Sequence, residues 1–335
     1  MDSSADVLII GSGVAGALLA CELAGKGGSV AIMEAGPRVD RAEAVRRFHA
    51  AYPKTPESAY RQSPFTPHPM TEDPRGFYAQ KGADVFNSTY LRQVGGTTWH
   101  WLGTAIRLVP DDFRLNSLFG LATDWPISYD DLEPWYCRAK RELEVSGDAA
   151  EDLGSPRSAP YPLPPVPQSF LDRRWKQALS GSKFDLRSTP QARRSKGSSS
   201  RPSCHGSASC IPVCPIQAKY DATVHIARAE MLGARLLTQT CANFIECHED
   251  GRVAAVRFRR PDVLMRRNRC GLQPNNLARL AHRNPLRWHG SLPRLPRKRP
   301  DQANGGARHC MKSPGRDHSV TGGGIISESG GAIIP

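Results

Sequence analysis

Three glycines near the amino terminus have the spacing of a loop that can bind a phosphate group. Gly11, Gly13 and Gly16 form a G-x-G-x-x-G motif directly after an apolar run. The first glycine permits a tight turn, the second lets a phosphate approach the backbone, and the third lets helix and strand pack closely. The pyrophosphate would lie at the helix N-terminus, where free N–H groups favour negative charge. The motif predicts a dinucleotide site in which Glu34, 18 residues beyond Gly16, accepts hydrogen bonds from ribose hydroxyls.

A second glycine loop, RQVGGTTWHW at residues 92–101, has the composition of a segment that can wrap a flavin. Paired glycines and two hydroxyl residues offer backbone N–H donors and little bulk near a ring system. With Gly36, which follows the second expected strand, the loop completes the predicted cofactor contacts. Its contributing residues are Arg92, Gly95, Gly96, Thr97, Thr98 and His100.

His100 has two interpretations. An imidazole nitrogen beside the flavin edge could form a covalent bond to the ring. Alternatively, His100 is a core residue packed between Trp99 and Trp101 and hydrogen-bonded to backbone. The two tryptophans themselves are expected in the core.

Three cysteines, Cys204, Cys210 and Cys214, lie within eleven residues, and Pro215 follows the last one. Short spacings let one loop surround a compact inorganic cluster, and a proline after the last ligand is typical of ferredoxin-like sites. A disulfide with one free thiol, or a zinc site completed by His205, are the alternatives.

The glycine motifs are placed by elements that the hydrophobic pattern predicts. Residues 6–36 are expected to form strand, helix and strand, and an irregular stretch follows to residue 90. A helix at 129–145 precedes a Pro/Ser/Arg-rich connection. This connection covers residues 154–202. It is followed by an expected helix at 221–232 and three expected strands within 234–258, of which the last two form a hairpin.

Charge is unevenly distributed. The chain carries a formal net charge of +13, but residues 259–335 alone hold 15 Lys plus Arg against 4 Asp plus Glu, which leaves +2 for the rest. This segment has no sustained apolar period and offers too little burial to offset the entropy of ordering it, so we expect disorder. Trp288 is its only large aromatic side chain, and no recognition-helix or zinc-finger pattern is present, which argues against a nucleic-acid binder.

Other features exclude further classes. The amino terminus has no basic region before its apolar run and is not expected to be a signal peptide. No apolar stretch approaches the ~20 residues that span a bilayer. The nine cysteines are an odd number and mostly scattered, unlike a disulfide scaffold.

Several motifs together resemble the glucose–methanol–choline (GMC) oxidoreductase family. The resemblance covers residues 5–258 and is closest to the flavoprotein (large) subunits of gluconate, sorbitol, fructose and glucose dehydrogenases. The motifs that carry it are EAGP at 34–37, FNSTYLRQVGGTTWHW at 86–101, DWPISYDDLEPWY at 124–136 and SCHGSASCIPVCPIQAKY at 203–220. It implies an α/β fold, a three-layer, Rossmann-like FAD-binding domain that is incomplete here and carries irregular loops.

The resemblance also implies a chemistry. Such a subunit would oxidise CH–OH groups of sugars, polyols or sugar acids with FAD, and relatives carry a [3Fe–4S] centre where Cys204, Cys210 and Cys214 stand. Electrons would pass from flavin through this centre to a cytochrome. The implied partners are a small subunit with a twin-arginine signal and a membrane-bound cytochrome c, at the periplasmic face of the inner membrane; a cytoplasmic location is the alternative.

The similarity to the family ends after residue 258. We therefore divide the chain into an FAD-binding portion, 1–258, which includes the Cys-rich loop 203–220, and a basic tail, 259–335. Family members continue with a substrate sheet and a catalytic His with a second His or Asn, neither of which is recognisable here. We assign no catalytic residue. The composition of the tail is the one expected if the family sequence is truncated or its reading frame has shifted. The alternative to an active dehydrogenase is that the chain is a catalytically inactive remnant, without the substrate domain and the catalytic pair.

Overall fold

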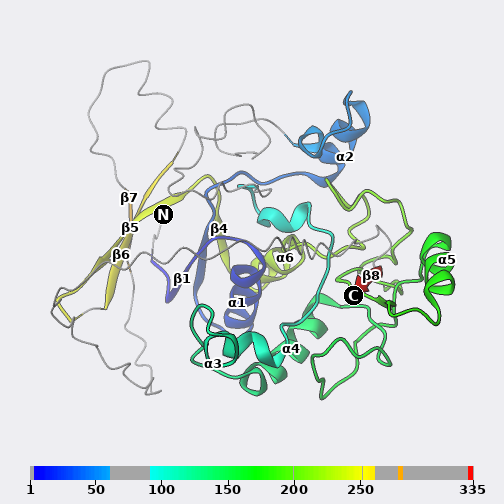
Figure 1. Ribbon diagram of the computed structural model, residues 1–335. Coiled ribbons are helices and arrows are strands. Elements are labelled where there is room, and N and C mark those ends of the chain that lie inside the picture. Colours follow the sequence, from blue (N-terminus) through cyan, green and yellow to red (C-terminus); the bar gives the residue numbers. More distant parts are fainter. Residues whose placement is uncertain are drawn as a thin grey trace, which may run out of the picture.

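The computed structural model describes residues 4–60, 91–198, 200–250 and 252–260, together with the backbone of two short strands at 278–281 and 331–334. These residues form the predicted α/β architecture (Figure 1). The three layers are helices, a parallel sheet and an antiparallel sheet.

The central layer is a three-stranded parallel sheet. Strands β1 (Val7–Ile10), β2 (Val30–Met33) and β4 (Arg235–Leu237) lie in the order β1-β2-β4. All four residues of β2 are buried, as expected for the middle strand of a parallel sheet covered on both faces. The sheet therefore requires a layer on each side.

Helices α1 (Val14–Gly25) and α6 (Thr223–Met231) pack against each other and cover one face. Side chains alternate between the faces of a strand. Ile9, Val30 and Ile32 accordingly share one buried cluster with the alanines of α1 and the apolar side of α6.

The opposite face is covered by an antiparallel sheet of β5 (Cys241–Cys247), β6 (Val253–Arg259) and β7 (Ala278–Ala281). Met33 on β2 packs there against Val256 and Phe258 of β6. Successive positions of β2 thus contribute to two different cores, which ties the three layers together.

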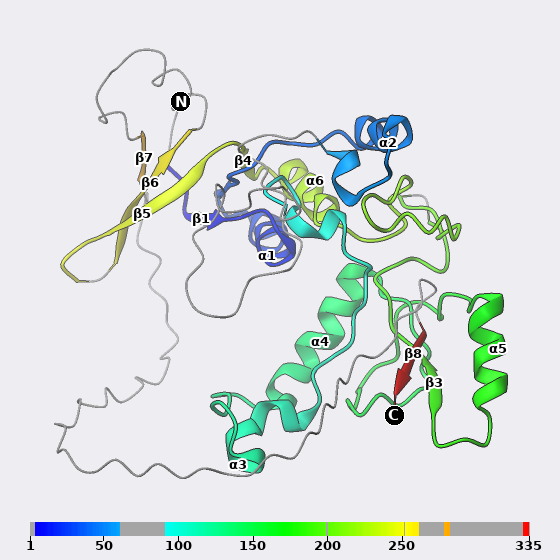
Figure 2. The same ribbon diagram turned by 45° about the horizontal axis from the view of Figure 1, so that its top comes forward.

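The remaining elements surround this unit. In Figure 2, α4 runs away from the central sheet and carries α3 at its far end, while α5 and β3 lie to the side. These elements are α2 (Arg41–Ala50), α3 (Leu115–Phe119), α4 (Tyr129–Leu143), α5 (Phe170–Leu179), β3 (Asp185–Ser188), β8 (Gly331–Ile334), and the 3₁₀ turns η1 (Pro56–Ala59), η3 (Gly96–Trp99) and η4 (Pro110–Arg114).

Most predicted elements are confirmed, including strand–helix–strand at 6–36, the helix at 129–145, the helix at 221–232 and the hairpin within 234–258. Two predictions were wrong in part. The stretch after residue 36 contains α2, and the connection 154–202 contains α5 and β3. Helix α2 is polar and only weakly amphipathic, whereas α5 has apolar side chains that are largely exposed, and both helices begin at a capping residue. Asp40 accepts a bond from the backbone N–H of Glu43, and Ser169 forms a capping box with Asp172.

The predicted tail is described only at β7, which pairs with β6, and at β8, which pairs with β3. The prediction of disorder for the other residues of 261–335 lies outside the described residues, as do residues 61–90. Among the described residues, no helix is long and apolar enough to cross a membrane.

Candidate functional site

The first glycine loop has the geometry that its spacing predicts. Gly11 leaves β1 with a left-handed φ of +94°, and a Cβ on Gly16 would lie 2.1 Å from the carbonyl oxygen of Gly11. A side chain on Gly16 would therefore separate α1 from the loop. A Cβ on Gly13, by contrast, would meet no atom within 4 Å. Gly13 is the N-cap of α1 and provides no side-chain cap, so the helix N-terminus faces open space that a phosphate could fill.

Glu34 ties the end of β2 to this loop. Its side chain is buried, with 7% of the residue exposed. One carboxylate oxygen accepts bonds from the Ser12 N–H at 3.1 Å and the Ser12 hydroxyl at 2.6 Å, and the other accepts the Gly36 N–H at 2.8 Å. Each carboxylate oxygen can accept two bonds. The oxygen facing Gly36 thus retains acceptor capacity for a ribose hydroxyl.

Ser12 joins the two glycine loops and was not predicted. It is fully buried, and its hydroxyl donates to Glu34 while accepting the Gly95 N–H at 3.1 Å. The position is an unspecified x within G-x-G, so the motif gave no sign of it. The structure brings Gly11–Gly16, Glu34 and Gly95 into one connected site.

Gly36 and Arg92 form the second junction between the loops. A Cβ on Gly36 would lie 1.9 Å from the carbonyl oxygen of Arg92, so only glycine allows this approach. The neighbouring Val94 N–H donates to the Pro37 carbonyl at 3.0 Å. Arg92 thus contributes its backbone to the junction, while a contact of its side chain with a cofactor remains a prediction.

The second glycine loop turns sharply beside the first. Gly95 and Gly96 have φ values of +89° and +55°, which L side chains rarely adopt. A Cβ on Gly96 would lie 3.9 Å from Gly13 Cα. The Thr98 hydroxyl donates to the Gly95 carbonyl at 2.5 Å and accepts the Ala222 N–H at 2.9 Å, while the Thr97 carbonyl accepts the His100 N–H.

His100 and the adjacent tryptophans are buried. His100 is 2% exposed, and its covalent bond to a flavin remains a prediction. Trp99 lies under the Arg41 guanidinium, 4.4 Å from the ring centroid, and donates to the Val94 carbonyl. The half-buried Trp101 donates to the Tyr220 carbonyl at 2.8 Å. Both tryptophans therefore have structural partners.

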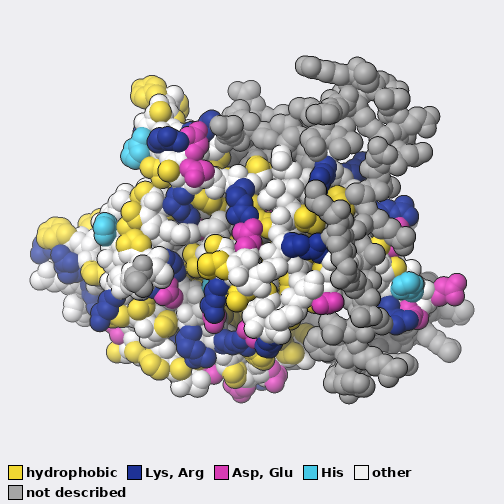
Figure 3. All heavy atoms as spheres, turned by 180° about the vertical axis from the view of Figure 1, so that it is seen from behind, with side chains coloured by type: hydrophobic (Ala, Val, Ile, Leu, Met, Phe, Trp, Pro, Cys, Tyr) yellow, Lys and Arg dark blue, Asp and Glu magenta, His cyan; other side chains and the backbone are white. Residues whose placement is uncertain are grey.

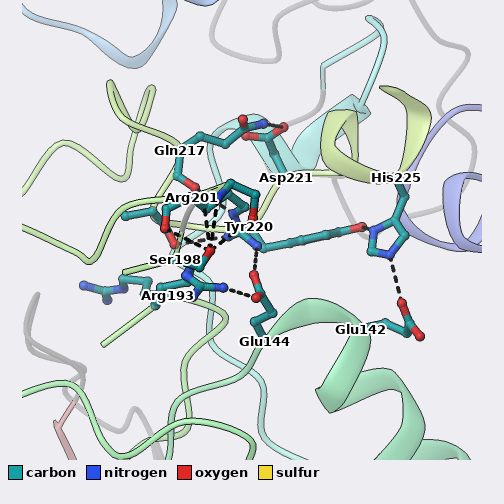
Figure 4. Close-up of polar contacts among 12 residues, drawn as sticks. Glu142, Glu144, Arg193, Ser198, Arg201, Gln217, Tyr220, Asp221 and His225 are labelled. Carbon is teal, nitrogen blue, oxygen red and sulfur yellow. Dashed lines mark hydrogen bonds and ion pairs between the residues drawn. The ribbon is translucent and has the colours of Figure 1, made fainter. Parts of the chain in front are cut away.

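A polar network connects the segment before α6 to α4 (Figure 4). The Tyr220 hydroxyl lies 2.9 Å from His225 Nδ1, and His225 Nε2 lies 3.3 Å from a carboxylate oxygen of Glu142. Burial raises the pKa of Tyr220 and lowers that of His225, while the Glu142 carboxylate partly opposes the second shift. Arg201 binds Glu144 at 2.6 Å in the same view.

A cavity of about 700 Å³ opens beside this network, between the second glycine loop, α4 and α6. Five arginines and two glutamates line it, so its wall is predominantly cationic. Several of these arginines already bind carboxylates: Arg38 binds Glu230, Arg41 binds Asp221, and Arg201 binds Glu144. The positive charges that line the cavity are therefore largely neutralised by ion pairs, and the cavity lies next to the cofactor loops.

The three clustered cysteines lie on the loop before α6. Cys204, Cys210 and Cys214 are all free thiols, which gives no support to the disulfide alternative. Burial raises the pKa of Cys210, and the nearby Cys204 and Cys214 contribute to the rise. Within the described part of the chain, no three His, Cys, Asp or Glu side chains are arranged to hold a metal ion, and His205 is exposed. The three thiols thus do not fit a cluster as they stand.

Comparison with known proteins agrees with this geometry. Residues 6–59 match the family described as FAD binding domain. The chain is 35% identical over 268 residues to the fructose dehydrogenase large subunit of Gluconobacter japonicus, covering 77% of this chain and 49% of that protein. It is 32% identical over 177 residues to 2-methyl-1,2-propanediol dehydrogenase of Mycolicibacterium austroafricanum, covering 52% and 30%.

A third relative is an uncharacterized GMC-type oxidoreductase of Mycobacterium tuberculosis. It is 28% identical over 267 residues, covering 77% of this chain and 35% of that protein. The chain thus spans about half the length, or less, of these relatives.

Proposed function

Because the chain belongs to the GMC oxidoreductase family, we propose that it is the FAD-binding portion of a dehydrogenase that oxidises CH–OH groups of sugars, polyols or sugar acids. The similarity to a fructose dehydrogenase subunit and to a diol dehydrogenase supports this substrate class. The electron acceptor in the proposal is neither NAD nor oxygen.

One observation carries the proposal. The two glycine loops meet at the N-terminus of α1, where Ser12 links Glu34 to Gly95 and the position beside Gly13 is open. A diphosphate there would face the first-turn N–H groups of α1. The ribose would lie by Glu34, and the flavin would extend along Gly95–His100.

FAD, when bound, supplies the acceptor for a hydride from the alcohol carbon. The chain itself contributes binding and orientation. The backbone N–H groups at Gly13 and the start of α1 would bind the diphosphate, and the carboxylate of Glu34 would accept a hydrogen bond from the ribose. The buried turn at Gly95 and Gly96 would let the flavin approach backbone N–H groups without obstruction by a side chain.

The proposal also includes an iron–sulfur centre at the three clustered cysteines. The family resemblance alone supports a [3Fe–4S] centre held by Cys204, Cys210 and Cys214, because the arrangement of these three free thiols does not fit a cluster. Since the thiols are not arranged around an ion, we derive no electron path through them. Iron and acid-labile sulfide measured on anaerobically purified protein test this part. Cys137→Ser, which changes a thiol outside the loop, is the control and should contain as much iron and sulfide as the wild-type protein. The absence of both elements from the wild-type protein would rule it out.

The partners and the location follow from the proposed subunit role. The relative from Gluconobacter is named as a large subunit, which supports assembly with other subunits. We propose a small subunit with a twin-arginine signal and a membrane-bound cytochrome c, at the periplasmic face of the inner membrane.

The decisive experiment is cofactor uptake followed by turnover. Purified protein is mixed with FAD, separated from free cofactor, and its visible spectrum is recorded. Bound flavin with maxima in the visible range supports the FAD site, and colour that survives denaturation and washing supports the His100 bond. Dye reduction with a panel of sugars and polyols then tests the activity. Folded protein that takes up no flavin refutes the proposal.

A further inference from the structure

Lys219 is a buried cation on the segment before α6. Only 1% of the residue is exposed, and its ammonium group donates to the carbonyl oxygens of Trp99 at 2.7 Å and Thr98 at 3.1 Å. Among the described residues, no carboxylate lies within ion-pair distance of it. Within the described part of the chain, its hydrogen-bond acceptors are therefore these backbone carbonyls of the second glycine loop.

A buried ammonium group destabilises the folded chain, so its presence here suggests a functional role for the charge. Moving an ammonium group from water to a protein interior is strongly unfavourable. Burial lowers the pKa of Lys219 to about 8, and the nearby Cys210, Asp221 and Cys214 only partly oppose that shift. A methionine of similar length would fill the same volume without this penalty.

The ammonium group fixes the segment that follows the glycine loop. Arg193 pairs with Lys219 in an antiparallel bridge, and its guanidinium Nε donates to the Leu102 carbonyl at 3.2 Å. A Cβ on Gly103 would lie 3.4 Å from Lys219 Cγ and 3.5 Å from Arg193 Cγ, so the two cationic side chains lie together under residues 98–103. His100 lies between the carbonyls that they hold.

We propose that Lys219 is a positioning residue for the flavin. Its ammonium group holds the carbonyls of Thr98 and Trp99, which orients the loop, and it places a buried positive charge beside the bound ring. A positive charge there favours the reduced flavin, which has gained electrons, over the oxidised one. The inference rests on the proposed function, since it requires flavin on this loop.

The test compares Lys219→Met, which removes the charge, with Lys219→Arg, which keeps it. Lys140→Met is the matched control, because Lys140 is a second buried lysine; it lies on α4, and its ammonium group is over the Tyr161 ring rather than bonded to the glycine loop. FAD affinity is measured by fluorescence titration, and the flavin midpoint potential is measured against a reference dye.

For Lys219→Met we expect FAD binding to weaken about tenfold and the reduced/oxidised ratio at a fixed potential to fall about tenfold, which is about 30 mV for a two-electron couple. Lys219→Arg and Lys140→Met should retain the wild-type potential. A role in packing alone would change affinity but leave the potential unchanged.

The other possible results either overturn this inference or overturn the proposed function. A wild-type potential in Lys219→Met, or an equal shift in Lys140→Met, overturns the inference. If Lys219→Met does not fold, the neutral donor variant Lys219→Gln replaces it, and the same shift in potential is expected. Wild-type protein that binds no FAD overturns the proposed function, whereas normal FAD uptake with no effect of Lys219 overturns only this inference.

Discussion

At the scale of single residues, spacing predicted the glycines but not the polar groups that join them. Gly11, Gly13 and Gly16 occupy the positions that a phosphate loop requires. Ser12 and Lys219 bond to groups 83 and 120 residues away in the chain. Ser12 is an unspecified position within the G-x-G-x-x-G motif, and Lys219 lies in the 203–220 segment without a role assigned to it. Such long-range hydrogen bonds depend on how the loops pack, and no local pattern encodes them.

Gly13→Ala and Gly16→Ala should separate binding from folding. Gly13 has a φ of −67° and free space around it, so alanine should leave the free energy of unfolding within about 0.5 kcal/mol of wild type. The added methyl group would occupy the approach of the diphosphate, so FAD affinity should fall at least about tenfold. Urea unfolding and fluorescence titration measure the two effects.

Gly16→Ala is the contrasting variant. Its Cβ would lie 2.1 Å from a backbone oxygen, which only a backbone shift can relieve. We expect destabilisation of about 1–3 kcal/mol, as for overpacked sites. Equal stability of the two variants would show that the helix and loop are not packed as described.

Ser12→Ala should weaken both stability and cofactor binding. The substitution leaves the Gly95 N–H without its buried acceptor and removes a donor to Glu34. An unsatisfied buried group costs about 1–3 kcal/mol. Denaturant midpoints and the Kd for FAD should both change; Ser117→Ala, at an exposed position, is the control. A wild-type Kd in Ser12→Ala would mean that the link between the loops does not support the cofactor site.

At the scale of elements, the hydrophobic pattern predicted the buried strands and the helices that cover them. On β2, Val30 and Ile32 pack in the core on one face of the sheet, and Met33 packs in the core on the other face. The helices α2 and α5 were missed, because each lies in a stretch rich in proline and polar residues, where a capping residue begins a helix that the surrounding composition does not indicate.

The contact between α4 and α6 should make stability depend on pH. Burial depresses the pKa of His225 in the folded chain below its ordinary value of 6.5. Below pH 6.5 the unfolded chain therefore binds a proton that the folded chain does not, so the free energy of unfolding falls as pH decreases. The loss attributable to His225 approaches about 1.4 kcal/mol per pH unit at most.

His225→Gln isolates this contribution. Glutamine can still bond to Tyr220 and Glu142 but does not titrate. Urea unfolding between pH 7.5 and 5 should show a smaller loss of stability in the variant than in wild type, with His205→Gln, at an exposed histidine, behaving as wild type. Parallel slopes for all three proteins would contradict a buried, neutral His225.

At the scale of the whole molecule, the net charge of +13 says little about the cofactor site. Residues 1–258 carry only +2, and Figure 3 shows basic, acidic and hydrophobic side chains intermixed on one face of the described residues. The local cations that matter, Lys219 and Arg193, are buried and count for little in any bulk value. On our proposal, the cofactor site depends on a few placed charges rather than on the overall field.

FAD should stabilise the three-layer unit as a whole, because the loops that bind it connect the central sheet to α1 and to the segment before α6. A ligand at 100 times its Kd adds about 2.7 kcal/mol to the folded state. For a chain of this size, that corresponds to a rise in Tm of about 4–5 °C. Thermal unfolding with and without FAD measures the shift. Gly13→Ala, whose FAD affinity we expect to fall at least about tenfold, should show at most about half of that rise at the same FAD concentration, while Lys140→Met should show the full rise. An equal rise in Gly13→Ala would place the stabilising flavin somewhere other than the N-terminus of α1.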